Sequence, residues 1–144
     1  MFSKACKYGI KAIIYIATQS LEGKRVKIND VVDNCGSPEA FTGKILGSLV
    51  KYDIVHSHTG PNGGFQIESK KLKRIKVSDI VLAIDGASVY NECSLGFGIC
   101  SNDRPCPMHT SFVKIKNELR RTLETTTIYD LAVGCKNGLL FLTG

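Results

Sequence analysis

Hydrophobic residues near the start of the chain recur at the spacing of amphipathic helices, with polar residues between them. They predict a first helix over residues 4–20 and a short second helix over residues 28–34. A third helix is expected over residues 38–52, where Ser37 has a favourable N-cap side chain and Pro38 suits the first helical position. The chain is therefore expected to begin with a group of helices joined by short turns.

A strong turn signal follows the third helix. Two short extended segments, residues 54–57 and 65–68, flank a glycine-rich run from Thr59 to Gly64 and predict a β-hairpin. Two helices joined by a glycine-containing turn and followed by a hairpin form the winged helix-turn-helix, whose second helix enters the major groove of DNA. We therefore expect an α+β fold that is mainly α-helical.

The third helix combines an apolar stripe with a polar face. Phe41, Ile45 and Leu49 share the stripe and are expected to pack inside the domain. The polar face is then free to enter the major groove, and the hairpin tip is expected near the DNA backbone or minor groove. The predicted DNA-binding residues are Ser37, Thr42, Lys44, Ser48, Thr59 and Asn62.

A long amphipathic helix is predicted in the second half of the chain. A short helix over residues 78–84 precedes it, and residues 87–106 show no helical or strand period and are expected to form an irregular loop. The next apolar residues recur at near-heptad spacing, which favours dimerisation, although packing on the helix's own domain would explain the same stripe. The predicted dimer interface consists of Met108, Phe112, Ile115, Leu119, Leu123 and Thr126.

The predicted elements divide the chain into four segments, and most of the positive charge lies in the first. We expect a winged helix-turn-helix domain over residues 1–76, a connecting helix and cysteine loop over 77–106, a dimerisation helix over 107–130 and a tail over 131–144. Residues 1–76 carry 13 Lys and Arg against 6 Asp and Glu (+7), and the remainder carries 6 against 7 (−1). A basic half favours double-stranded DNA through counterion release, although basic faces also occur on proteins that bind nothing acidic.

The cysteines of the predicted loop form a metal-site pattern. Six residues separate Cys93 from Cys100, five separate Cys100 from Cys106, and two separate Cys106 from His109. Only the last interval matches the close ligand pair usual in structural zinc sites, whereas wider spacing suits an iron-sulfur cluster. Spacing leaves an iron-sulfur cluster, zinc and no metal open. The isolated cysteines expected to be small buried side chains are Cys6, Cys35 and Cys135.

Other functional classes lack support in the sequence. The chain contains no GxSxG, HExxH or phosphate-loop motif, so we expect no enzyme and no small-molecule substrate. Lys7 and Lys11 interrupt the N-terminal segment, which predicts a cytoplasmic protein without a membrane span. An electron-transfer protein is the weakest alternative, because an electron carrier needs neither a helix-turn-helix nor a basic half.

Several motifs coincide with those of one bacterial family. They are residues 8–12 (YGIKA), 41–46 (FTGKIL), 60–65 (GPNGGF), 75–80 (IKVSDI) and the three loop cysteines. With them the chain resembles the Rrf-type winged-helix transcriptional regulators, which include the iron-sulfur cluster regulator IscR and the nitric-oxide-sensing repressor NsrR.

The resemblance implies a DNA-binding repressor whose operator affinity is modulated by a cluster sensing iron-sulfur status, nitric oxide or redox change. It implies a homodimer crossed by the long helices, with Cys93, Cys100 and Cys106 as ligands and His109 at the fourth position. IscR-like members have five residues between the first two cysteines, whereas this chain has six. The resemblance therefore leaves both a 2Fe-2S and a 4Fe-4S cluster open. Tyr8 stands where other branches have an acidic ligand, which favours His109.

The DNA-reading residues also depart from the family pattern. Thr59 stands in the wing where many members have an arginine, and Lys44 stands where glutamine is common. The operator sequence of other members is therefore not carried over to this chain.

Overall fold

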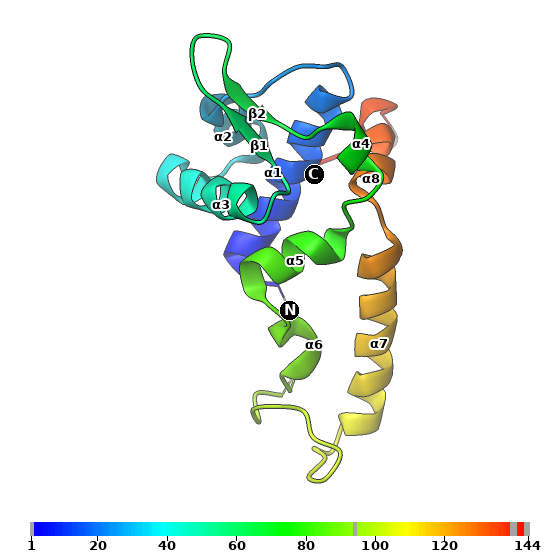
Figure 1. Cartoon of the computed structure of the whole chain (residues 1–144). Coiled ribbons are helices and arrows are strands. Elements are labelled where there is room, and N and C mark those ends of the chain that lie inside the picture. Colours follow the sequence, from blue (N-terminus) through cyan, green and yellow to red (C-terminus); the bar gives the residue numbers. More distant parts are fainter. Residues whose placement is uncertain (1, 94, 139–140, 143–144) are drawn as a thin grey trace.

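The N-terminal helices frame the domain core in the computed structural model, which describes residues 2–93, 95–138 and 141–142. They are α1 (Lys4–Ser20), α2 (Ile28–Cys35) and α3 (Glu39–Lys51), in agreement with the predicted ranges to within a residue at each end. Their apolar stripes meet inside the domain, where Ile13, Ile16 and Leu46 are fully buried. Figure 1 shows α2 and α3 on the same side of α1, with α2 above α3 in that view.

The wing is an antiparallel pair of strands, β1 (His56–His58) and β2 (Gly64–Gln66), with Ser57 opposite Phe65. Val26, from the α1–α2 connection, extends this pair on the other side of β2 by exchanging two backbone hydrogen bonds with Phe65 (2.9 and 2.7 Å). Strand β1 begins later in the sequence than predicted, and β2 begins and ends earlier. The reason is that the apolar residues at 54, 55 and 67 are buried in the core and are not paired in the sheet.

Two further helices connect the wing to the second half of the chain. The basic segment after the wing, residues 70–76, overlaps the short helix α4 (Ser69–Leu72), which is held by the buried side chain of Leu72. Helix α5 (Val77–Asp85) then packs across α1, with Ile80 and Val81 fully buried. The side chain of Asp85 accepts hydrogen bonds from the backbone and hydroxyl of Ser3, which joins the end of α5 to the start of α1.

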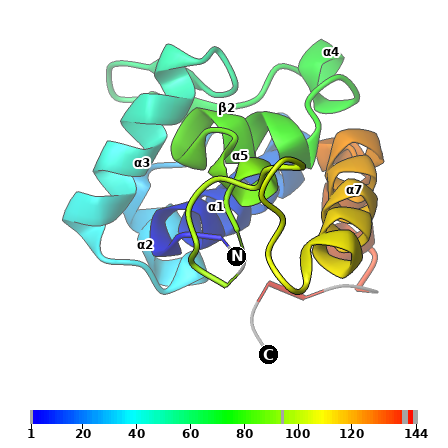
Figure 2. The same cartoon turned by 90° about the horizontal axis from the view of Figure 1, so that it is seen from below.

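The second half contains α6 (Ser88–Asn91), α7 (His109–Thr125) and α8 (Ile128–Lys136). Figures 1 and 2 show α7 on the opposite side of the molecule from α3. Helix α8 returns to pack against α1, with Ile128 and Ala132 fully buried. The predicted boundary between residues 130 and 131 therefore falls inside a helix, and α6 lies within the segment predicted to be irregular.

The end of α7 is fixed to the N-terminal domain by backbone hydrogen bonds. Val77 donates to the carbonyl of Thr126, and Ile128 donates to that of Ile75, both at 3.0 Å. The outcome is a mainly helical fold with a small antiparallel sheet, and the predicted fold class is confirmed. Within the described residues, no helix has the length and apolar character needed to span a membrane.

Candidate DNA interface and cluster site

The start of α3 is held by two buried hydroxyl groups. Ser37 and Thr42 are 4% and 2% exposed, their hydroxyls lie 2.5 Å apart, and Thr42 donates to the carbonyl of Pro38 at 2.7 Å. Pro38 occupies the N-cap, so the expectation that Ser37 caps the helix is wrong. Both side chains were expected to face DNA. In this structure their hydroxyls instead bond to each other and to the start of the helix, so we leave them out of the DNA surface proposed below.

The other expected DNA residues lie at or near the surface. Lys44 is exposed on α3, and the half-buried Ser48 one turn later donates to the Lys44 carbonyl at 3.3 Å. Thr59 and Asn62 are exposed in the turn between the wing strands. Ile45, Leu46 and Leu49 are buried on the other side of α3, as the apolar stripe indicated for two of them.

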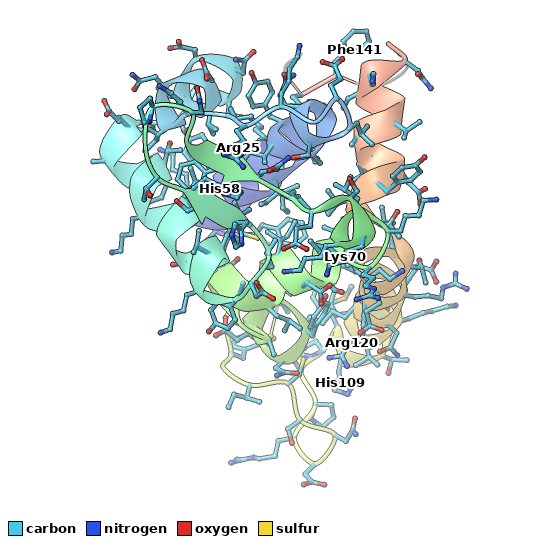
Figure 3. The ribbon with its side chains drawn as sticks, turned by 45° about the horizontal axis from the view of Figure 1, so that its top comes forward. Arg25, His58, Lys70, His109, Arg120 and Phe141 are labelled. Atoms are coloured by element: carbon cyan, nitrogen blue, oxygen red, sulfur yellow. The ribbon has the colours of Figure 1, made fainter. Side chains whose placement is uncertain are left out.

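Arg25 is a surface residue of the wing that the sequence analysis missed. It precedes Val26, whose pairing with Phe65 brings it beside the wing, where Figure 3 shows it close to His58. Its guanidinium donates to the Asn62 carbonyl at 3.1 Å and to the side-chain oxygen of Gln66 at 3.5 Å. The basic run at residues 24–27, immediately after the first helix, was the available signal.

The histidine beside Arg25 adds little positive charge to the wing. Partial burial and the cationic Arg25 hold the pKa of His58 below its ordinary value, with His56 contributing in the same direction. Since an ordinary histidine pKa is about 6.5, the ring of His58 is neutral near pH 7. Arg25 therefore provides a fixed cation next to a neutral ring.

The basic run after the wing is engaged within the protein. Lys71 pairs with Asp53 at 2.9 Å, Lys70 with Glu68 at 3.5 Å, and the ammonium of Lys73 lies 4.7 Å from the ring centroid of Tyr129. Surface pairs of this kind contribute little stability, but they reduce the charge available to phosphate. These contacts make direct phosphate binding by Lys70, Lys71 and Lys73 the weaker interpretation of this run.

The cysteine loop starts as a short pairing of two backbone arms, residues 91–93 and 98–100. The amide of Cys93 donates to the Gly98 carbonyl at 2.7 Å, and the amide of Cys100 donates to the Asn91 carbonyl at 2.8 Å. Gly96 and Gly98 adopt positive φ values of 80° and 93°, which the reversal between the arms requires. Strand alternation in this pairing places Cys93 and Cys100 on the same face.

The thiol of Cys93 has different electrostatic surroundings from the thiols of Cys6 and Cys35 in the core. Backbone amides of Phe97 and Leu95 hold the pKa of Cys93 below its ordinary value, and a hydrogen bond with the Cys106 side chain and the charge of Lys116 act in the same direction. By contrast, burial, followed by Asp85, raises the pKa of Cys6 to about 12. Burial also raises the pKa of Cys35. The thiolate, which is the form that binds metals, is thus favoured at Cys93 and disfavoured at Cys6 and Cys35.

The expected burial of the isolated cysteines is confirmed at two positions. Cys6 and Cys35 are fully or almost fully buried, and Cys135 is half-buried.

The four expected ligands are brought near one another in pairs. The side chain of Cys106 is near enough to Cys93 to help lower the pKa of its thiol, while Cys100 and His109 line a common cavity of about 360 Å³ between the loop and α7. His109 Nε2 hydrogen-bonds to the side-chain oxygen of Asn102 at 2.9 Å. In the described part of the chain, no three His, Cys, Asp or Glu side chains converge on one point that a metal ion could occupy.

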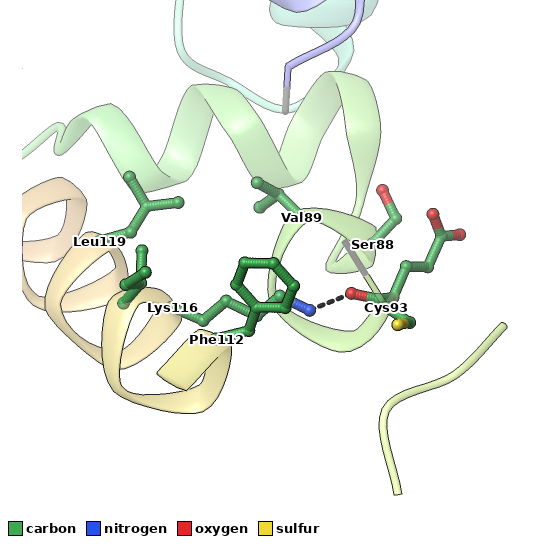
Figure 4. Close-up of a pocket in the computed structure, with 8 residues that line it drawn as sticks. Ser88, Val89, Cys93, Phe112, Lys116 and Leu119 are labelled. Atoms are coloured by element: carbon green, nitrogen blue, oxygen red, sulfur yellow. Dashed lines mark hydrogen bonds between the residues drawn. The ribbon is translucent and has the colours of Figure 1, made fainter. Parts of the chain in front are cut away.

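Lys116 also belongs to this site, although the sequence analysis did not identify it. Its ammonium donates to the backbone carbonyl of Glu92, as Figure 4 shows, and lies 3.5 Å from the sulfur of Cys100. The sequence could have indicated it, because Lys116 follows Phe112 by one helical turn and is therefore a lysine on the apolar side of the predicted helix. A cavity of about 460 Å³ adjoins it and is lined by Ser88, Val89, Glu92, Cys93, Phe112, Ile115, Lys116 and Leu119.

The predicted dimer stripe has two parts. Near the loop, Met108 and Ile115 are exposed and Phe112 is half-buried. Near the other end, Leu123 is buried in the core of its own domain and Leu119 packs against that core. Thr126 is half-buried, and its hydroxyl donates to the carbonyl of Thr122 at 2.7 Å. The alternative of packing on the same domain thus accounts for Leu123.

The chain is similar in sequence to known transcriptional regulators. The model of the Rrf2 family, described as iron-dependent transcriptional regulators, matches residues 2–134. A helix-turn-helix protein of Aquifex aeolicus assigned to transcriptional regulation is 30% identical over 133 residues, which cover 91% of this chain and 90% of that protein.

Two solved structures share the fold. CymR, the global cysteine regulator of B. subtilis, superposes with a TM-score of 0.76 at 20% identity, covering 92% of this chain and 96% of CymR. IscR of T. potens superposes with a TM-score of 0.73 at 20% identity, covering 97% of this chain and 91% of that IscR chain. Because the family match extends from the first helix into α8, this chain belongs to the Rrf2 family of helix-turn-helix transcriptional regulators and is not an enzyme.

Proposed function

We propose that this chain is a cytoplasmic repressor that binds operator DNA as a homodimer and whose affinity is controlled by an iron-sulfur cluster. Cys93, Cys100 and Cys106 would hold the cluster, with His109 as the fourth ligand. The observation that supports this most directly is the position of the cysteine loop. The loop lies at the end of the molecule away from the wing and leads directly into α7, the helix proposed to join the two copies.

The donor set fits a cluster in its chemistry. Thiolates are the standard ligands of iron-sulfur clusters and histidine is an established partial replacement. The surroundings of Cys93 favour its thiolate, and Cys106 is within hydrogen-bonding reach of it. When bound, the cluster would supply a group that responds to iron supply, nitric oxide or redox change. Since the ligands do not converge, binding requires the loop to reorganise. The hydrogen bond from His109 Nε2 to Asn102 leaves Nδ1 as the ring nitrogen available to iron.

The proposed DNA surface combines α3 with the wing. Lys44 and Ser48 would enter the major groove, and Thr59, Asn62 and Arg25 would contact the backbone or minor groove. In a dimer, two such surfaces bind half-sites about one helical turn apart, so their separation determines affinity. A change in the loop beside α7 would alter that separation.

The deciding experiment is anaerobic purification followed by visible absorption and analysis of iron and sulfide. The cluster-loaded protein and the triple variant with Cys93, Cys100 and Cys106 replaced by Ala are then compared on one operator at fixed salt. We expect affinities that differ at least tenfold, about 1.4 kcal/mol, which is usual for coupled sites. Equal affinity and equal footprints for the two proteins would exclude control by a cluster.

The fourth ligand is tested in the same preparation. His109→Ala should leave the cluster bound but more easily lost, because three thiolates hold it without the imidazole. Cluster retention identical to that of the parent protein would remove His109 from the ligand set.

The second candidate is a winged-helix regulator with structural zinc or no metal. Its metal-free form is favoured by one observation, namely that no three donor side chains of the described residues converge on a point, because structural zinc also needs converging ligands. The metal analysis separates the candidates, since zinc without sulfide, or neither, would support the second.

A further inference from the structure

Lys116 is the charged side chain that the described part of the chain buries, with 8% of its surface exposed. Lysine is among the residue types that are rarely buried without a partner, because removing an ammonium group from water is costly. The partners of Lys116 therefore indicate what its charge is for. It lies on the side of α7 that faces α6 and the cysteine loop.

The ammonium of Lys116 contacts both arms of the loop. It donates to the carbonyl of Glu92 on the first arm and lies 3.5 Å from the sulfur of Cys100 on the second. These arms are the ones closed by the hydrogen bonds from the amides of Cys93 and Cys100. A single side chain of α7 thus spans the backbone pairing that carries two of the expected ligands.

The charge of Lys116 faces a backbone oxygen and a sulfur atom. No ion pair between Lys116 and a carboxylate occurs among the described residues, and the Glu92 contact uses the backbone oxygen. Three thiolates in one loop would place concentrated negative charge beside this ammonium. In a partly dry site, such opposite charges attract more strongly than they do in water.

We propose that Lys116 is the positioning residue that fastens the cysteine loop to α7 and supplies the positive charge facing its thiolates. Changes at the cysteines would then reach α7 through this side chain. The part of the inference that concerns a bound cluster rests on the proposed function, whereas the part that concerns the loop without a cluster stands independently of it.

The cluster-free protein provides the first test. Lys116→Met keeps a long side chain without the charge, Lys116→Arg keeps the charge, and Lys114→Met removes a charge from an exposed position of the same helix. Hydrogen exchange is measured at the amides of Cys93 and Cys100, which close the loop. We expect at least tenfold faster exchange in Lys116→Met and parent-like exchange in Lys114→Met, with core amides unchanged in both.

The cluster-loaded protein provides a test that a purely structural role would not pass. Loss of a neighbouring positive charge disfavours the reduced, more negative cluster, so Lys116→Met should lower the reduction potential and Lys116→Arg should restore it. Cluster release should be faster in Lys116→Met by about 10- to 100-fold, the usual effect of removing a group that supports metal ligands.

The outcomes separate this inference from the proposed function. Parent-like exchange at Cys93 and Cys100 in Lys116→Met, or an unchanged potential once the variant is loaded, would overturn the role of Lys116. Absence of a cluster in the parent protein would instead reject the proposed function, and the exchange rates would still decide whether Lys116 holds the loop. If Lys116→Met does not fold, Lys116→Gln takes its place in the exchange measurement.

Discussion

The polar residues of α3 have different environments although they are close in sequence. Thr42 is buried and bonded to Ser37 and Pro38, while Lys44, two positions later, points to solvent. A buried hydroxyl that loses its partner retains the cost of having been removed from water. Thr42 is therefore expected to affect stability, and Lys44 to affect DNA affinity.

Thr42→Val tests the structural role. Valine preserves the shape of the side chain but removes both hydrogen bonds and leaves Ser37 without this partner. We expect a loss of about 1–3 kcal/mol in the free energy of unfolding, measured by chemical denaturation at one protein concentration. Parent-like stability together with weakened DNA binding would restore Thr42 to the list of DNA contacts.

Lys44→Ala tests the DNA-reading role on duplex DNA selected by the parent protein from a random library. If Lys44 reads a guanine, its loss costs about 1–3 kcal/mol and relaxes specificity at one position. If it contacts phosphate, affinity decreases by the same factor for all DNA sequences, and the slope of log affinity against log salt concentration becomes shallower by about one unit. Lys51→Ala, at the end of the same helix, controls for the change in net charge. Unaltered affinity in Lys44→Ala would take this residue out of the interface.

The sequence correctly predicted the burial of a side chain where its spacing along the helix determines that burial. The prediction failed where a single contact determines it. The stripe with Ile45 and Leu49 correctly predicted the buried side of α3. It did not distinguish Thr42 from Lys44, because threonine is small enough to be buried by bonding its own helix backbone. Lys116 was missed for the related reason that its partners come from a different segment, the cysteine loop.

At the level of elements, the wing depends on a close approach of two backbones. Gly64 has φ of 138°, and a Cβ atom placed there would lie 2.8 Å from the carbonyl oxygen of Val26. That carbonyl accepts the hydrogen bond from Phe65, so the same contact attaches β2 to the α1–α2 connection. The position of Arg25, next to Val26, depends on this attachment.

Gly64→Ala should therefore displace the wing. The strained φ alone costs about 1–3 kcal/mol, and the contact with Val26 adds to it. We expect faster hydrogen exchange at the amides of Val26 and Phe65 and weaker DNA binding, with parent-like exchange in α8. Gly47→Ala, in an open position of α3, is the matched control for the exchange measurement. Unchanged exchange at both wing amides would show that the backbone approach is not needed.

The elements that the sequence predicted well are those with a long period or a strong turn. Helices α1, α3 and α7 have repeated apolar positions, and the glycine-rich run at residues 60–64 defines the hairpin. The short helix α6 offers too few positions for a period. Helix α8 was left unassigned because its burial depends on contact with α1, from the other end of the chain. Tertiary packing decides such segments, and their local pattern is weak.

For the whole molecule, the candidate site was predictable in composition but not in arrangement. The spacing correctly placed three cysteines in one loop, and His109 follows at the start of α7. Their pairing as Cys93 with Cys106 and Cys100 beside His109 depends on the turn at Gly96 and Gly98 and on packing against α7. Neither factor is visible in the spacing.

The proposed dimer interface is restricted by the way α7 packs on its own domain. Leu123 and Leu119 contribute to the core of the same chain, so charged substitutions there would unfold the domain and reveal nothing about the dimer. Met108 and Ile115, nearer the loop, are left exposed, and Ile115 is 54% exposed. An exposed apolar side chain on an amphipathic helix is the place to test self-association.

Ile115→Glu should therefore separate the two copies without unfolding either. In a two-fold interface each copy presents the same residue, so one substitution introduces two charges into the buried contact. We expect sedimentation at micromolar concentration to show mainly monomer for Ile115→Glu, with a helical circular dichroism spectrum like that of the parent. Asn117→Glu introduces the same carboxylate at an exposed polar position of α7 and should remain dimeric. A fully dimeric Ile115→Glu would place the main interface elsewhere, and the cysteine loop would then have no direct connection to the separation of the two DNA-reading domains.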